Sequence, residues 1–127
     1  MRLSNHKIVA LVPISDGDRA KSFYVDKLGL KFLSDDGFAI VLDADGNKVR
    51  LTKMKDVKPQ PFTVLGWEVA DIASVIPELQ GSGVVFERFG DFMKQDELGV
   101  WTAPDGSKVA WFKDPDGNIL SVSQHHS

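Results

Sequence analysis

The chain has 127 residues, of which 43% are hydrophobic and 26% charged, with a formal net charge of −3 and no cysteine. This length and apolar content suit one globular domain, and the slight acidity provides no broad basic surface for nucleic acid. The absence of cysteine excludes disulfides and thiolate metal sites. The apolar run at residues 8–11 is too short for a signal peptide, and no run is long enough to span a membrane. We therefore expect a cytoplasmic protein.

The first half of the chain predicts a strand, a helix and three further strands. A β-branched, apolar strand at residues 7–12 precedes a helix that Ser15 or Asp16 can cap and that Gly29 ends. Three short strands then complete the half, at residues 31–33, 38–42 and 49–54.

The same order restarts after a polar, proline-bearing linker at residues 56–61. A strand at residues 62–69 leads into a helix that Asp71 can cap. Because proline is comfortable only in a first turn, Pro77 suggests that the regular helix begins near Ser74. The strands that follow are expected at residues 84–86, 109–112 and 119–122.

These two halves predict a single domain over residues 1–127 with two modules, residues 1–55 and 62–127. The exits from the two helices match, as Gly29-x-x-Phe32 and Gly83-x-x-Phe86. The second module carries extra chain at residues 87–107, including a short strand at residues 100–102. Such an insertion is either a functional lid or binding loop, or a surface loop with an edge hairpin.

A repeated signature, Asp-x-Asp-Gly-Asn, occurs at residues 43–47 and 114–118. Each copy joins two runs of β-forming residues. Glycine adopts a positive φ without strain, and Asp and Asn side chains satisfy backbone groups in turns, so each copy predicts a hairpin. The repetition indicates a duplicated module with two equivalent turns.

Residues 18–24, 28–30 and 111–120 together resemble the vicinal oxygen chelate superfamily, which includes glyoxalase I, extradiol dioxygenases and bleomycin-resistance proteins. The resemblance implies an α+β fold in which paired βαβββ modules form a curved mixed sheet, or cup, around a ligand. It also implies a homodimer. In enzymes of this superfamily, side chains from the first and last strand of each module hold a divalent metal.

The repeated turn locates the corresponding positions in this chain. Three residues after each turn Asn stand Arg50 and Ser121, and the first strands offer Val9 and either Val64 or Leu65. Aliphatic side chains, a guanidinium and a single hydroxyl do not bind a divalent ion, which requires carboxylate or imidazole ligands. We therefore expect no metal and no other cofactor.

The histidines do not replace the missing ligands. His6 has the opposite side-chain parity from Val9 on the predicted first strand, so it points away from the cup. His125 and His126 end the chain, where a flexible tail is the expectation.

Arg50 is the central candidate for ligand binding. A cation on a cup-facing strand needs a partner, because an unpaired buried charge is costly. The partner is either a carboxylate of the protein, for which Glu68, Asp96 and Glu97 are available, or a ligand carboxylate, phosphate or enolate.

Large and flexible side chains extend this candidate site. Trp67, Trp101 and Trp111 are suited to stack on an aromatic ligand, or to fill a core or a dimer interface. Met54 can form an adaptable rim. Glu97 is the residue of its loop most expected to turn inward.

Three functions remain open from the sequence. The favoured one is a metal-independent protein that binds a small organic ligand, aromatic or anionic, in an apolar cup near Arg50 and Ser121. The second is a lyase-, isomerase- or dioxygenase-like enzyme that uses Arg50 and a carboxylate. The third is a dimeric scaffold with a vestigial cavity. Metal-dependent glyoxalase or dioxygenase activity and nucleic-acid or membrane partners are not expected.

Overall fold

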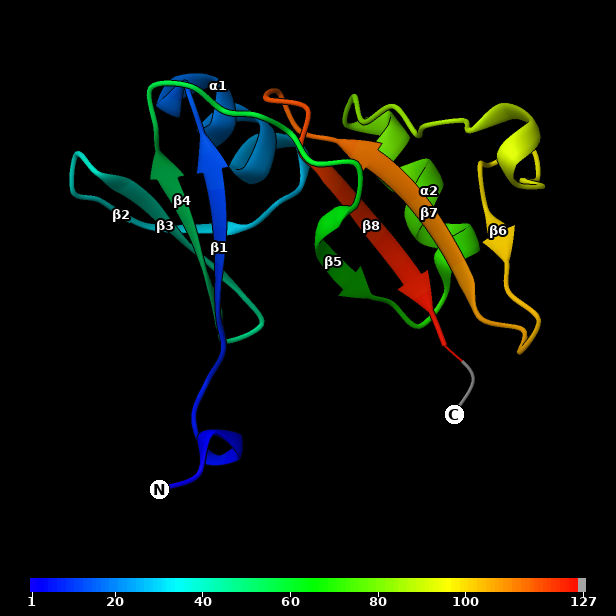
Figure 1. The fold of residues 1–127 in the computed structure, drawn as a ribbon, viewed down its shortest axis with the longest axis horizontal. Helices are drawn as coiled ribbons and strands as arrows, with labels where there is room; N and C mark the ends of the chain where they lie inside the picture. The colour runs from blue at the N-terminus through cyan, green and yellow to red at the C-terminus, as the bar shows by residue number, and fades with distance from the viewer. Residues whose placement is uncertain (126–127) are drawn as a thin grey trace. The chain divides into compact units, whose positions relative to one another are not determined.

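The computed structural model of the chain describes residues 1–125. It divides into two compact units, with the boundary between Lys58 and Pro59, and each unit contains one four-stranded sheet (Figure 1). Each sheet has a parallel pair formed by its first and last strands and antiparallel pairs elsewhere. The predicted α+β fold of paired βαβββ modules is confirmed.

The first unit follows the predicted order of elements. After a short 3-10 turn at Leu3–Asn5, its elements are β1 (Val9–Ile14), α1 (Gly17–Lys21), the π-helix η2 (Ser22–Lys27), β2 (Lys31–Asp35), β3 (Ala39–Ala44) and β4 (Asn47–Lys53). The strands lie in the order β1-β4-β3-β2. His6 precedes β1, so the prediction that it lies on the first strand was wrong.

The helical segment of this unit begins and ends at the predicted residues. Asp16 caps it, because its carboxylate accepts hydrogen bonds from the backbone N–H groups of Asp18 and Arg19 at 3.0 and 3.2 Å. The α-helix then widens into the π-helix, where the adjacent rings of Phe23 and Tyr24 are both buried. Gly29 follows with a φ of 80°, which terminates the segment.

The sheet of the first unit has one covered and one open face. Alternation along the strands places Val12, Ile40 and Leu51 in the core, all at most 1% exposed. Val9 and Leu11 of β1 point the other way and are 49% and 66% exposed. We call this second side the open face of the first unit.

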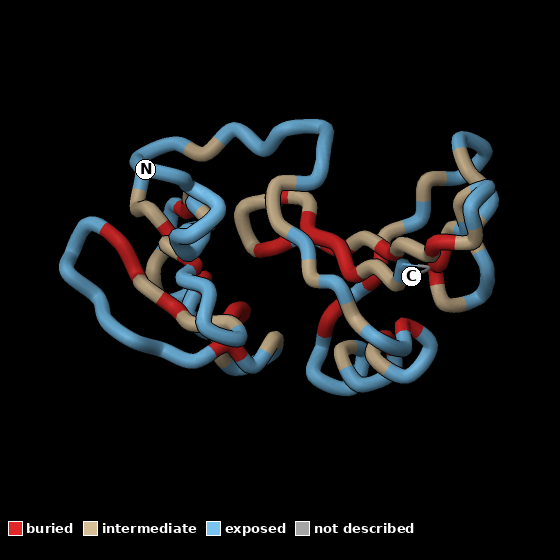
Figure 2. Tube along the Cα trace, turned by 90° about the horizontal axis from the view of Figure 1, so that it is seen from below, coloured by how far each residue is buried: buried red, intermediate tan, exposed pale blue. Residues whose placement is uncertain are grey.

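The second unit has the same topology with an interrupted edge. Its elements are β5 (Thr63–Glu68), α2 (Ile72–Gly81), the 3-10 turn η3 (Gly90–Phe92), β6 (Trp101–Thr102), β7 (Lys108–Lys113) and β8 (Ile119–Gln124). The strands lie in the order β5-β8-β7-β6. Figure 2 shows buried segments within both units and the largely exposed course of the chain that joins them.

Helix α2 differs from its prediction at the first turn. It begins at Ile72 and contains Pro77, so the expected start near Ser74 was wrong. The backbone N–H of Val75 already bonds to the carbonyl of Asp71 at 3.2 Å. Asp71 occupies the N-cap position without a capping bond from its side chain; instead the Gln124 side chain accepts from the N–H of Ile72 at 2.9 Å.

The predicted strand at residues 84–86 is present only as a single β-bridge at Phe86, at the edge of the sheet. Phe86 forms an isolated bridge with Phe112, and the N–H of Glu87 donates to the Trp111 carbonyl at 2.8 Å. The chain then leaves the sheet and returns at β6, where Trp101 pairs with Val109. The extra chain therefore interrupts the edge strand that corresponds to β2.

Both copies of the repeated signature join paired antiparallel strands, so the predicted hairpins are confirmed, but the prediction that their turns are equivalent was wrong. In the first copy Ala44 pairs with Asn47, and Asp45 and Gly46 have φ values of 51° and 84°, as in a two-residue type I′ turn. In the second copy a five-residue loop is closed around Asp114, which is 6% exposed. Its carboxylate accepts from the side chain of Asn118 at 2.8 Å.

Candidate functional site

The open face of the first unit carries Arg50. In the sheet, Arg50 of β4 lies between Leu11 of β1 and Val41 of β3, so these three side chains share the face away from the helix. Met54 follows the end of β4 and is 50% exposed. This face therefore combines a cation with exposed apolar side chains.

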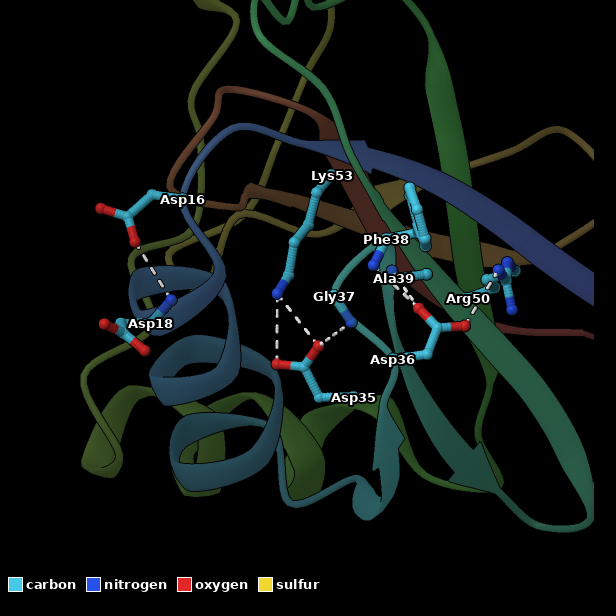
Figure 3. Close-up of polar contacts among 9 residues, drawn as sticks. All are labelled: Asp16, Asp18, Asp35, Asp36, Gly37, Phe38, Ala39, Arg50 and Lys53. Carbon is cyan, nitrogen blue, oxygen red and sulfur yellow. Dashed lines mark hydrogen bonds and ion pairs between the residues drawn. The ribbon is translucent and has the colours of Figure 1, made fainter.

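Asp36, in the turn between β2 and β3, is the partner of Arg50 (Figure 3). The Asp36 Oδ2 atom lies 3.5 Å from Arg50 Nη2, and the two side chains are 51% and 40% exposed. The predicted partners, Glu68, Asp96 and Glu97, were wrong. A local carboxylate takes their place because the turn brings it beside β4.

A second ion pair, formed by Asp35 at the end of β2, lies on the opposite side of β4. Lys53 Nζ donates to the two carboxylate oxygens of Asp35 at 3.0 and 3.2 Å. Arg50 and Lys53 differ in parity along the strand, so the adjacent residues Asp35 and Asp36 each engage a different cation, as Figure 3 shows.

The carboxylates of Asp35 and Asp36 are both stabilised in their charged form. The backbone N–H groups of Ala39 and Phe38, and then Arg50, hold the pKa of Asp36 below its ordinary value of 3.8. The N–H of Gly37, and then Lys53, lower the pKa of Asp35 in the same way. Their contribution to stability is therefore complete above the ordinary pKa and is lost as the pH falls through the lowered value.

The open face of the second unit is aromatic. Trp111 of β7 lies beside Ser121 of β8, and Trp101 of β6 has the same parity, so all three side chains share one face. The rings of Trp101 and Trp111 are 6.3 Å apart, and the Phe89 ring meets Trp111 edge-on at 5.4 Å. We call Phe89, Trp101 and Trp111 the aromatic face.

The indole of Trp111 has a defined orientation. Its Nε1–H donates to the Thr63 hydroxyl on β5 at 3.1 Å, so the side chain reaches across β8. A bond at the indole nitrogen satisfies the polar end of the side chain and leaves its ring for apolar contact. The bond to Thr63 therefore fixes the ring of Trp111 within the aromatic face.

Comparison with known proteins identifies the family. A model of the glyoxalase/bleomycin resistance protein/dioxygenase superfamily matches residues 6–122. The chain belongs to this superfamily. No curated protein matches the sequence.

Solved structures of other members have the same fold. A superfamily member from Alicyclobacillus acidocaldarius is 21% identical with a TM-score of 0.73, over 100% of this chain and 96% of that one. One from Sphaerobacter thermophilus DSM 20745 is 22% identical with a TM-score of 0.72, over 94% and 97%. TnmS3, an antibiotic binding protein from Streptomyces sp. CB03234, is 25% identical with a TM-score of 0.69, over 95% and 96%.

On the first strand of the second module Gly66, rather than Val64 or Leu65, lies beside Ser121, and on that of the first module Leu11, rather than Val9, lies beside Arg50. A register shift between Thr63 and Leu65 displaces the pairing, and Leu65 pairs instead with the buried Leu120. A Cβ on Gly66 would lie 2.6 Å from Ser121 Oγ. The serine, 8% exposed, thus takes the space that a side chain at residue 66 would need.

The divalent metal that the superfamily implies does not fit the residues at these positions. Leu11 and Val9 on β1, Arg50 on β4, Gly66 on β5 and Ser121 on β8 offer a single hydroxyl and a permanent cation. Divalent ions require several carboxylate, imidazole or carbonyl donors. Within residues 1–125, no three His, Cys, Asp or Glu side chains lie together.

Two other predicted site residues lie away from the open faces. Trp67 pairs with the buried Val122 and its ring stacks on Phe112, with centroids 6.3 Å apart, so it packs on the core face. Glu97 is exposed rather than turned inward. Its carbonyl accepts a hydrogen bond from Arg88, which holds the loop by its backbone.

Gln95 is a structural residue of this site that the sequence did not reveal. Its side-chain amide donates to the carbonyls of Glu87 and Gly99 at 3.1 and 2.8 Å and accepts from the N–H of Phe89 at 2.9 Å. These bonds tie both ends of the interrupting loop together and fix Phe89 beside Trp111. No local motif distinguishes such a glutamine from an ordinary loop residue.

A shallow hollow of about 330 Å³ lies at the end of β5 and β8. It is lined by Glu68, Val69, Ala70, Gln124 and His125. The His125 Nε2 atom is 2.9 Å from Ser123 Oγ. His126 falls outside the described residues.

No helix in the part of the chain that the structure describes is long and apolar enough to cross a membrane.

Proposed function

We propose that this protein binds a small, planar aromatic molecule on the aromatic face of the second unit, without a metal. The observation that carries the proposal is the orientation of Trp111. Its indole N–H is already bonded to Thr63, while Trp101 and Phe89 approach its ring at 6.3 and 5.4 Å. Large aromatic faces positioned before binding contribute affinity because little side-chain freedom remains to be lost.

The polar surroundings suit recognition of the ligand's edge. Ser121 stands beside Trp111 in the sheet, and Ser123 and Glu68 follow on the same face of the neighbouring strands. Pockets for small molecules typically combine apolar walls with a few such polar groups. The description of TnmS3 as an antibiotic binding protein supports a binding function for this chain as well.

Metal independence belongs to the same proposal. It rests on the donor chemistry at the expected ligand positions, where the chain has Leu11, Arg50, Gly66 and Ser121. Catalysis that needs a divalent ion bound to these strands is therefore not part of the proposed function.

The proposal is tested by titrating the full chain with 2-naphthol and with decahydro-2-naphthol in a calorimeter. The two probes share a hydroxyl and a bicyclic frame, but only the first has π faces. We expect 2-naphthol to bind about twofold to twelvefold more tightly, as for aromatic pairs of about 0.5–1.5 kcal/mol. Trp111→Ala is expected to remove this preference.

Matched variants separate the aromatic face from general effects on the fold. Trp111→Phe keeps a ring but removes the bond to Thr63, so it should retain part of the preference. Trp67→Phe changes a tryptophan on the core face and should leave it intact. A preference for 2-naphthol that survives Trp111→Ala, or no difference between the two probes, would contradict the proposed site.

A further inference from the structure

The open face of the first unit has the composition of a binding surface for an organic anion. Arg50 lies beside Leu11, and both Leu11 and Val9 are largely exposed, at 66% and 49%. Val41 of β3 lies on the other side of Arg50 and is half-buried. A guanidinium among exposed apolar groups matches a ligand with a carboxylate and an apolar body.

Asp36 is held in place independently of Arg50. Its Oδ1 atom accepts two backbone hydrogen bonds, from the N–H groups of Phe38 and Ala39, both at 2.8 Å. The turn therefore fixes the carboxylate and leaves Oδ2 directed at the guanidinium (Figure 3). Removing the ion pair should leave the conformation of the turn unchanged.

The contact between Arg50 and Asp36 is weak for an arginine–carboxylate pair. It joins one nitrogen to one oxygen at 3.5 Å, whereas charge-assisted bonds of this kind are about 2.7–2.9 Å long and often bidentate. Both side chains are substantially exposed, and surface ion pairs of this kind contribute little stability. A ligand carboxylate can therefore replace Asp36 at a small cost.

We propose that the open face of the first unit binds a small organic carboxylate through Arg50, and that Asp36 is an internal competitor for the guanidinium. In the structure the Asp36 carboxylate lies at one edge of the guanidinium. A ligand carboxylate takes that edge in bidentate fashion while its apolar body covers Leu11 and Val9. Asp36 thereby selects against anions that lack an apolar body. For such an anion, an ion pair with Arg50 only replaces the ion pair between Arg50 and Asp36, so no binding free energy is gained.

This proposal rests on other residues than the aromatic face of the second unit does, and its test uses a ligand without an aromatic ring. The probe is cyclohexanecarboxylate, and its neutral counterpart is cyclohexanecarboxamide. Binding to the full chain is measured by calorimetry, together with thermal unfolding of each variant. We expect the carboxylate to bind and the amide to bind more weakly.

The decisive variant is Asp36→Asn. The asparagine oxygen can still accept from Phe38 and Ala39, but the competing charge is lost, so the carboxylate should bind about twofold to fivefold more tightly. Asp35→Asn is the matched control, because it changes the net charge equally in the adjacent residue but frees Lys53 on the other side of β4. It should leave the affinity unchanged.

Arg50→Gln should abolish binding of the carboxylate, and Arg50→Lys should weaken it, since an ammonium lacks the planar fork. Weaker binding in Asp36→Asn would overturn the proposal, because it would make Asp36 a group that positions Arg50 for the ligand. Equal gains in Asp35→Asn and Asp36→Asn would overturn it as well, since net charge alone would then explain the effect. Carboxylate binding that survives Arg50→Gln would also overturn the proposal. The same holds if neither the wild type nor Asp36→Asn binds cyclohexanecarboxylate. None of these variants changes Trp111, so failure of this proposal and failure of the proposed function are read from different residues.

Discussion

At the residue scale, equivalent positions of the two modules have acquired different chemistry. Arg50 and Ser121 both follow a buried core residue on the last strand of their module, Val49 and Leu120. Their strand neighbours are Leu11 in one case and Gly66 in the other. One position thus provides a cation on an apolar face, and the other a small hydroxyl beside a tryptophan.

The packing of Gly66 against Ser121 is directly testable. Because a Cβ at residue 66 would lie 2.6 Å from Ser121 Oγ, Gly66→Ala is expected to lower the free energy of unfolding by about 1–3 kcal/mol. The measurement is urea unfolding. In a Ser121→Ala background most of this loss should disappear, since the clashing oxygen is gone.

Gly81→Ala is the control for this comparison, because nothing lies within 4 Å of its Cβ position and its backbone does not require glycine. It should be neutral or slightly stabilising. If Gly66→Ala lowered the free energy of unfolding equally in the wild-type and Ser121→Ala backgrounds, the contact with the Ser121 hydroxyl would not be the cause.

At the scale of elements, periodicity and turn chemistry predicted most of the fold. The order of strands and helices, the cap at Asp16 and the termination at Gly29 all follow from local residue preferences. Phe32 and Phe86 do occupy corresponding edge positions, since they pair with Leu42 and Phe112. The repeated signature correctly placed Arg50 and Ser121 on equivalent positions, although the two turns differ.

The remaining features depend on contacts that local sequence does not encode. The register shift between Thr63 and Leu65 arises where β5 pairs with β8, and it changes which residue lies beside Ser121. The helix continues through Pro77 because the packing of Ile72 and Ile76 in the core outweighs a lost backbone bond. The partner of Arg50 was missed because the turn at Asp36 forms only when β2 and β3 pair.

The loop that interrupts the edge of the second sheet depends on Gln95. Gln95→Leu removes two donors and one acceptor from three half-buried backbone groups, so hydrogen exchange should accelerate at residues 87–100. Affinity for 2-naphthol should fall as well, because Phe89 would lose its fixed position beside Trp111.

Gln80→Leu, a change of the same residue type at an exposed position of α2, serves as its control and should alter neither exchange nor affinity. If Gln95→Leu left exchange in the loop unchanged, the amide would not be what holds the loop in place.

At the scale of the whole molecule, duplication has preserved a βαβββ framework in two units while their open faces have diverged. The first unit offers Arg50 with exposed aliphatic side chains, and the second offers three aromatic rings with serines. Within residues 1–125, no three His, Cys, Asp or Glu side chains gather on either face as a divalent metal site requires. Dimerisation, which the resemblance to the superfamily implies, stays a prediction.

The most direct test of the proposed function is an NMR titration of the indole N–H signals with 2-naphthol. The chain has three tryptophans, and the structure places Trp101 and Trp111 on the open face and Trp67 on the core face. We predict that the signals of Trp101 and Trp111 shift together and saturate at one ligand concentration, while that of Trp67 stays in place. A saturable shift at Trp67 without one at Trp111, or no saturable shift at all, would contradict binding at the aromatic face.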